Sequence, residues 1–184
     1  RQKGIVEIKK KLEKKINKKD LENIKIKDLT NLLKDTNSKI IKKNLEKKRK
    51  IKGFKIPRFK GLLKNKDTRL GKEFAVYARV ATGIKGIIHS DELPGYGIKP
   101  KEVEKINDFF DIKDNDAFIF AIGQEKIVEN ALKAVLERAR LCFRGVPKEV
   151  RRALPDDTTE YMRPMPGAAR MYRETDVEPI RITK

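Results

Sequence analysis

An apolar run at residues 116–122 (DAFIFAI) constrains the fold most, because it leaves a strand almost no polar face. Such a strand is covered on both sides, or carries small Ala side chains on its thinner side. The most regular apolar helix pattern in the chain follows at once, formed by Ile127, Val128, Ala131, Leu132, Val135, Leu136 and Ala139. The two segments predict a central strand followed by an amphipathic helix.

Other segments alternate between helix and strand patterns. Apolar spacing predicts a first helix over residues 5–16, a helical turn near Leu29, and a second helix capped by residues 35–38. Three further sets of apolar residues at helical spacing mark the second helix and two later ones: Ile40, Ile41 and Leu45; Leu70, Phe74, Tyr77 and Ala81; and Val103, Ile106 and Phe110. Residues 84–90 read as a strand, and Gly83 is expected to end the helix before it. Residues 51–63 read as extended, and Pro57 predicts an edge strand or two short strands joined at a bend. The class is therefore mixed, with parallel crossovers possible.

The charge is unevenly distributed along the chain. The net charge is +19, and residues 1–70 hold 26 basic and 8 acidic residues. The Lys-rich part could attract a polyanion such as RNA, although a Lys-rich surface can also be only a solvated face. The basic run Lys47, Lys48, Arg49 and Lys50 follows a helix, where it complements the negative helix end or receives a phosphate.

Several classes of site are excluded by residue counts. The chain has one Cys and one His, which rules out a disulfide framework and a zinc site built from those residues. His89, beside Asp91 and Glu92, could act as a general base, but a structural role is favoured. No apolar stretch approaches the ~20 residues that a membrane span needs. The composition predicts no membrane association and a reducing compartment.

The chain changes character from Gly145 onward. Five prolines punctuate the last forty residues, apolar periodicity vanishes, and Arg replaces Lys as the main basic residue. We expect an extended tail that packs on something else. The tail includes the run TTEYMRPMPGAARMYRETD, residues 158–176. The planar guanidinium groups of its Arg side chains could hold phosphates, or could pair with neighbouring carboxylates.

The tail run YMRPMPGAARMYRETDVEP resembles the family of archaeal glutamyl-tRNA(Gln) amidotransferase E subunits, which are related to the bacterial B subunits. Upstream, KGFKIPRFKGLL, RLGKEFAVYAR and GIKGIIHSDELPGYGI follow in the order of that family's inserted domain. That domain is shared with bacterial-type aspartyl-tRNA synthetases. The resemblance covers nearly the whole chain.

The resemblance implies an α+β fold, in which a small antiparallel sheet packs with helices. It assigns residues 1–29 to an N-terminal helix and connector, 30–143 to the inserted domain, and 144–184 to a Pro/Arg-rich extended return segment of a larger cradle domain. The chain would be a fragment, inactive alone. Arg163, Arg170, Glu174 and Asp176 are candidates to line the cradle. Lys47, Lys48, Arg49, Lys50 and Arg58 are candidates to bind tRNA.

The function implied by the resemblance is conversion of Glu-tRNA(Gln) to Gln-tRNA(Gln) in the cytoplasm. The full-length enzyme would use ATP and Mg²⁺ to phosphorylate the glutamyl side chain, and ammonia from an asparaginase-like D subunit would displace the phosphate. No cofactor or metal is expected within the fragment. A non-catalytic RNA-binding module is the alternative, and an insertion domain of an aspartyl-tRNA synthetase is disfavoured by MRPMPGAARMY.

Overall fold

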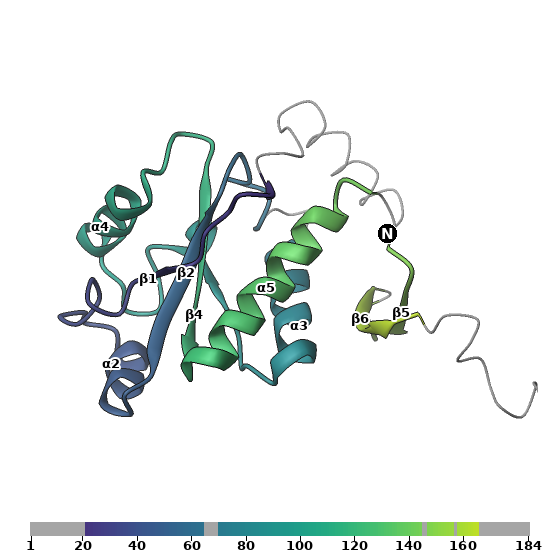
Figure 1. Ribbon diagram of the computed structural model, residues 1–184, viewed down its shortest axis with the longest axis horizontal. Coiled ribbons are helices and arrows are strands. Elements are labelled where there is room, and N and C mark those ends of the chain that lie inside the picture. Colours follow the sequence, from purple (N-terminus) through teal and green to yellow (C-terminus); the bar gives the residue numbers. More distant parts are fainter. Residues whose placement is uncertain (1–20, 65–69, 145–146, 157, 166–184) are drawn as a thin grey trace, which may run out of the picture.

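A computed structural model describes residues 21–64, 70–144, 147–156 and 158–165 (Figure 1). The helix expected over residues 5–16 lies outside these ranges. The described elements are β1 (Lys27–Asp28), α2 (Lys39–Glu46), β2 (Lys50–Ile56), α3 (Leu70–Thr82), β3 (Ile88–His89), a 3₁₀ turn (Ser90–Glu92), α4 (Pro100–Phe110), β4 (Ala117–Gly123), α5 (Glu125–Leu141), β5 (Glu149–Ala153) and β6 (Thr159–Pro164).

The main sheet has four strands in the order β1-β2-β4-β3, and every pairing is antiparallel. This confirms the α+β class and the antiparallel sheet, and no parallel crossover occurs among the described strands. The long central pair runs in register from Lys50 opposite Gly123 to Ile56 opposite Ala117.

The prediction that residues 51–63 form an edge strand or two short strands is wrong. β2 is one strand of seven residues with neighbours on both sides. Pro57 lies just beyond its end, where its missing N–H is not needed by the ladder. The strand expected over residues 84–90 is reduced to Ile88–His89.

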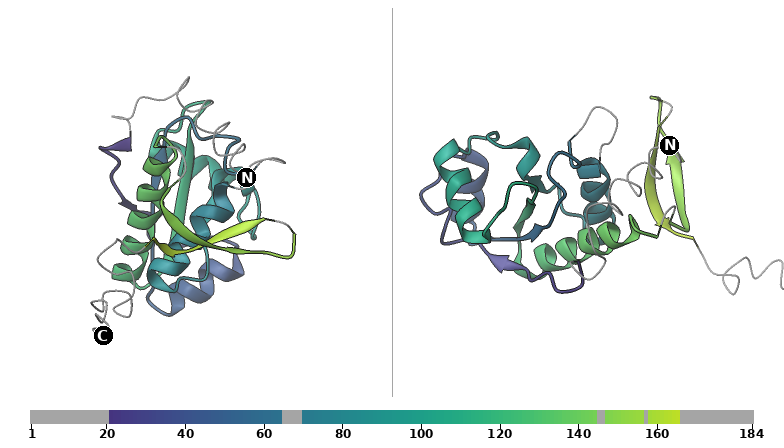
Figure 2. Two further views of the ribbon diagram at one scale, coloured as in Figure 1. Left: turned by 90° about the vertical axis from the view of Figure 1, so that its right-hand side faces the viewer. Right: turned by 90° about the horizontal axis from the view of Figure 1, so that it is seen from above.

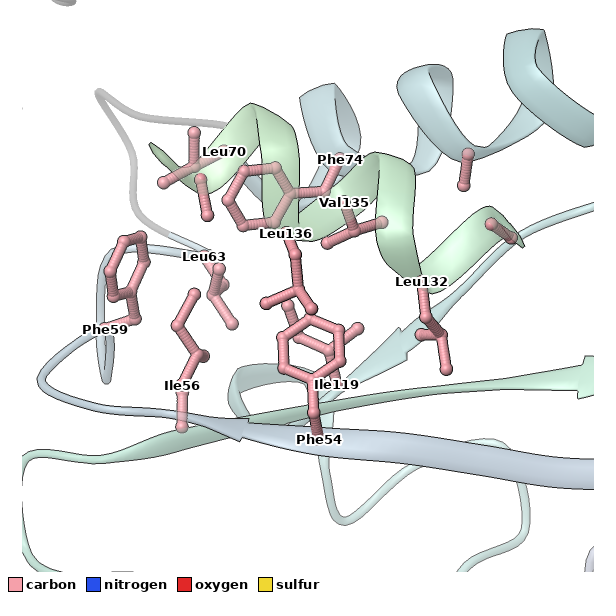
Figure 3. Close-up of a cluster of buried hydrophobic side chains, with 14 of the residues drawn as sticks. Phe54, Ile56, Phe59, Leu63, Leu70, Phe74, Ile119, Leu132, Val135 and Leu136 are labelled. Carbon is pink, nitrogen blue, oxygen red and sulfur yellow. The ribbon is translucent and has the colours of Figure 1, made fainter. Parts of the chain in front are cut away.

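Helices cover both faces of the sheet, with α3 and α5 on one side and α2 and α4 on the other (Figure 1). Successive residues of a strand point to opposite faces. Phe54 and Ile119 therefore join the core under α3 and α5 (Figure 3), whereas Phe118 and Phe120 join the core under α2 and α4. The prediction that the 116–122 run is covered on both sides is confirmed. Within the described ranges, no helix combines the length and the apolar character that crossing a membrane requires.

The predicted helix ends are mostly confirmed. Gly83 has φ +72° and its N–H donates to the Arg79 carbonyl oxygen at 2.7 Å, which closes α3. Ser38 is the N-cap of α2, as expected, but its hydroxyl donates to the Tyr96 carbonyl oxygen at 2.6 Å and makes no capping bond. This bond instead fastens the loop of residues 91–99 to the start of α2.

The tail forms a hairpin of β5 and β6 beyond the main sheet (Figure 2). Strand β6 contacts α3, which stands between the hairpin and the sheet in Figure 1. The extended character predicted from the sequence is therefore confirmed for this part, and the surface on which it packs is a helix of the same chain.

Gly53 lies in the middle of β2, where no side chain fits. An added Cβ would lie 2.6 Å from the Ile119 carbonyl oxygen and 2.6 Å from the Phe120 Cβ. We expect Gly53→Ala to lower the free energy of unfolding by about 1–3 kcal/mol, measured by urea denaturation. Gly86→Ala is the matched control, because its Cβ would meet no atom within 4 Å. Equal effects of the two substitutions would contradict the close approach of β2 and β4.

Candidate functional site

The basic corner, formed by Lys47, Lys48, Arg49 and Lys50, occupies the turn that joins α2 to β2. Lys48 has φ +53°, so the backbone takes a left-handed conformation between the end of α2 and the start of β2. Arg49 Nη1 donates to Asn44 Oδ1 at 2.8 Å, and Lys50 Nζ lies 3.9 Å from Asp28 Oδ2. Lys47 and Lys48 are exposed and form no ion pair with another described residue. Their ammonium groups are therefore free for an external anion, as far as the described part of the chain shows.

Arg58, the fifth tRNA-binding candidate, lies apart from the basic corner. It follows the far end of β2, and the strand between them spans roughly 20 Å at ~3.3 Å per residue. Its backbone N–H donates to Asp116 Oδ1 at 3.1 Å, and its side chain is exposed. The structure thus brings four of the five candidates together and separates the fifth.

One of the four cradle candidates lies within the described residues. Arg163 stands in β6 opposite Val150, and it is exposed. Arg170, Glu174 and Asp176 lie outside the described residues. The described ranges hold no group of three His, Cys, Asp or Glu side chains arranged to bind a metal ion, so no Mg²⁺ site is assigned within them.

A charged cluster that sequence reasoning missed joins the hairpin to the domain. We call it the junction network; it consists of Glu73, Tyr77, Arg138, Glu149 and Arg151. Arg151 reaches from β5 to α3, where Nη1 lies 2.7 Å from Glu73 Oε1 and Nη2 lies 2.9 Å from Glu73 Oε2. Arg138 of α5 approaches Glu73 Oε1 to 3.5 Å through Nε. Glu149 accepts from both Arg151 and the Tyr77 hydroxyl.

The environment of the network shifts its titrating groups. Burial and the hydrogen bond to Glu149 raise the pKa of the Tyr77 phenol above its usual range. Burial alone would lower the pKa of Arg151, but its bonds to Glu73 and Glu149 outweigh this and raise it. Both groups therefore keep their protons at ordinary pH.

A weak sequence signal for the network exists in the two helices. Glu73 sits four residues before Tyr77 in the α3 pattern, and Arg138 sits inside the apolar stripe of α5. A charge within an apolar stripe requires a partner. The identity of the partner was out of reach, because Arg151 is 78 residues away from Glu73.

His89 serves the fold in the described structure. It is 3% exposed, and its Nε2 lies 3.5 Å from Glu92 Oε1. Asp91 Oδ2 accepts backbone N–H bonds from Gly61, Leu63 and Lys64 at 2.9, 3.1 and 3.3 Å. The burial of His89 supports the expectation of a structural role, and the neighbouring Asp91 stabilises residues 61–64.

A shallow groove of about 390 Å³ lies between residues 24–26 and α5. It is lined by Ile24, Ile26, Glu129, Lys133, Leu136 and Arg140. None of the candidate residues named above lines it, so it adds nothing to the candidate sites.

His89 gives a pH prediction, because it is the only histidine in the chain. Burial lowers its pKa more than Glu92 and Asp91 raise it, so the unfolded chain binds the proton more tightly. This contribution to stability is complete above pH 6.5, the ordinary pKa, and is lost as pH falls towards the lower folded pKa. The slope is at most about 1.4 kcal/mol per pH unit.

We expect His89→Asn to remove this slope between pH 7 and 5, measured by urea denaturation at several pH values. Asp28, Asp116 and Glu129 also have lowered pKa values, but their contributions are lost only near and below their ordinary values of 3.8 for Asp and 4.5 for Glu. A variant that keeps the wild-type slope in this window would show that His89 is not the buried neutral group.

Comparison with known proteins places the structure in a family. The GAD domain model matches residues 41–132, which run from α2 into α5. The E subunit of the glutamyl-tRNA(Gln) amidotransferase of Sulfurisphaera tokodaii is 49% identical over 189 residues, covering 99% of this chain and 30% of the relative. The corresponding E subunits of Pyrococcus furiosus and Methanocaldococcus jannaschii are 51% and 48% identical, covering 85% and 87% of this chain and 25% and 26% of the relatives.

The chain thus spans between a quarter and a third of the length of these curated relatives. The similarity to the Sulfurisphaera tokodaii E subunit covers 99% of the chain, and so includes the matched domain and the flanking segments. The antiparallel sheet with helices on both faces coincides with the family match, and the chain belongs to the GAD domain family.

Proposed function

We propose that the chain is part of a tRNA amidotransferase that converts Glu-tRNA(Gln) to Gln-tRNA(Gln). The observation that carries this proposal is the sequence identity to amidotransferase E subunits. One of these relatives is 49% identical to this chain, and the alignment covers 99% of it. The matched region includes the GAD domain and the segment that begins in β6. The proposed partners are tRNA(Gln) charged with glutamate and an asparaginase-like D subunit that supplies ammonia, in the cytoplasm.

ATP with Mg²⁺ supplies the phosphoryl group that activates the glutamyl carboxylate in this reaction. The chain's own contribution lies in the segment that starts at β6. Arg163 presents its guanidinium to solvent from β6, and a planar Arg fork suits a pair of phosphate oxygens. In the proposal Arg163 and Arg170 neutralise phosphate charge, while Glu174 and Asp176 line the same cradle.

The GAD domain has a different part in the proposal. Its described ranges contain no clustered metal ligands, and His89, the one histidine, is buried. The free ammonium groups of the basic corner fit attraction of an RNA backbone better than chemistry on a glutamyl group. An RNA-binding role for this domain is therefore the second candidate, and it is compatible with the first.

Substitution of two arginines tests the proposed reaction. The test uses an amidotransferase E subunit whose matching segment is replaced by residues 1–184, with ATP and a supplied ammonia source. We expect Arg170→Ala to lower the rate of Gln-tRNA(Gln) formation on the order of 10²-fold, because a phosphate contact is lost. Arg58→Ala should change it little, because its exposed side chain lies at the far end of β2.

The outcome separates the placement of the active site from the proposed reaction itself. If the Arg58 variant is the more damaged, or the Arg170 variant is fully active, the cradle assignment is wrong. If the unsubstituted protein forms no Gln-tRNA(Gln), the proposed reaction is wrong.

Salt dependence tests the RNA contact of the basic corner in residues 1–184 alone. We expect log affinity for tRNA to fall linearly with log salt, by roughly 0.7–0.9 per phosphate neutralised. Lys47→Gln with Lys48→Gln should make this slope shallower, measured by fluorescence anisotropy. Arg58→Gln is the single-charge comparison. A slope that is unchanged by the lysine substitutions would remove the basic corner from the interface.

A further inference from the structure

The hairpin of β5 and β6 is held on α3 by contacts with defined geometry. Both terminal nitrogens of Arg151 meet the two oxygens of Glu73, which fixes the direction of the guanidinium plane as well as its distance. Arg151 also bonds within its own hairpin, through Nε to Thr159 Oγ1 at 2.9 Å and through Nη2 to the Thr159 carbonyl oxygen at 3.1 Å. One side chain thus ties β5, β6 and α3 together.

These contacts are largely removed from water. Glu73 is 8% exposed and Arg138 is 2% exposed. The side chains of Arg151 and Glu149 are 17% and 4% exposed. Buried charged hydrogen bonds are directional and are screened little by salt, so the network holds one orientation of the hairpin.

The specific tail motif begins inside this docked hairpin. Tyr161 stacks on Tyr77, with ring centroids 3.9 Å apart and an angle of 15°. Glu160 is buried and forms an ion pair with Arg152 of β5, while Arg79 of α3 lies 3.6 Å from it. The next residues of β6, Met162 and Arg163, are exposed. The docked residues therefore determine where Arg163 lies relative to the domain.

We propose that Arg151 is a positioning residue. Through its bidentate bond to Glu73 it fixes the hairpin on the GAD domain, and so determines where Arg163 meets the proposed cradle. This inference rests on the proposed function, because it assigns the GAD domain a role as the rigid support of the hairpin that carries Arg163. Arg151 acts through the backbone of β6 and contacts no reacting group.

The variants are chosen to release the hairpin and leave the domain folded. Arg151→Met removes the guanidinium group and keeps an aliphatic side chain of similar length, while Glu73 remains beside Arg138. Arg151→Lys keeps the charge and loses the bidentate geometry. Arg152→Met is the matched control, because Arg152 is adjacent, is 59% exposed and pairs with Glu160 inside the hairpin.

The first measurement reports the placement of the hairpin in residues 1–184. Spin labels at Asn130→Cys on α5 and Met162→Cys on β6 give a distance distribution, and Cys142 stays unlabelled because it is 3% exposed. We expect one narrow distance in the unsubstituted chain and in the Arg152 variant. Arg151→Met should broaden the distribution, and Arg151→Lys should restore it in part. An unchanged distribution in Arg151→Met would overturn the inference.

The second measurement reports the catalytic consequence in the amidotransferase E subunit that carries residues 1–184. We expect Arg151→Met to lower kcat by about tenfold to 10²-fold, because misplacement of the segment costs orientation of the reacting groups. KM for Glu-tRNA(Gln) should stay within about twofold of the unsubstituted value, since the basic corner is untouched. Arg151→Lys should recover part of kcat.

The outcomes distinguish this inference from the proposed function. A broadened distance with unchanged kcat, or an equal loss in Arg152→Met, would overturn the positioning role and leave the proposed reaction standing. An unsubstituted protein that forms no Gln-tRNA(Gln) would overturn the proposed reaction and the positioning role with it. The distance measurement would still decide whether Arg151 docks the hairpin.

Discussion

The pairing of β2 with β4 is the interaction on which the rest of the structure depends. The two strands face each other along their full length and separate two apolar cores. Each of the described helices packs on one of the faces that this pair creates. Gly53 allows the approach, because any side chain there would strike the partner strand. Loss of the pair would leave neither α3 and α5 nor α2 and α4 with a surface to cover.

Two lysines in the middle of β2 each meet a carboxylate partner. Lys52 points towards α5 from β2, and its ammonium lies 2.5 Å from both Glu125 Oε1 and Glu129 Oε1. Lys55 points to the opposite face, where Asp116 Oδ2 lies 2.9 Å away. The alternation of the strand therefore places one lysine in each layer, and each helical layer or loop supplies the acid. The basic corner differs from these lysines, because its first two members have no such partner among the described residues.

Periodic patterns predicted much of the fold. The type and approximate position of four elements could be predicted from apolar residues alone, namely α3, α4, α5 and β4. A buried helix face or strand requires apolar residues at regular intervals, and these intervals can be recognised in the sequence. Pro57 led to the wrong prediction for β2, since a proline just past the end of a strand looks the same as one within it. The antiparallel pairing came from the resemblance and not from the spacing.

The candidate site was predicted less completely, because sites depend on residues far apart in the sequence. The basic corner is contiguous and could be named from sequence, whereas Arg58 could not be separated from it without the course of β2. Arg151 and Glu73 could not be paired, since nothing local distinguishes a docked arginine from a solvated one. The tail could be predicted as extended, but its docking on α3 required the three-dimensional structure.

The pairing inside the junction network has a consequence for the free energy of separating the hairpin from the domain. Glu73 already lies beside Arg138 within the domain, and Glu149 already bonds to Arg151 within the hairpin. Each side of the contact is thus electrically balanced before the two meet. Separation of the hairpin from α3 would therefore leave a guanidinium beside each carboxylate. The free energy of separating the two parts would not include the penalty of an isolated buried ion.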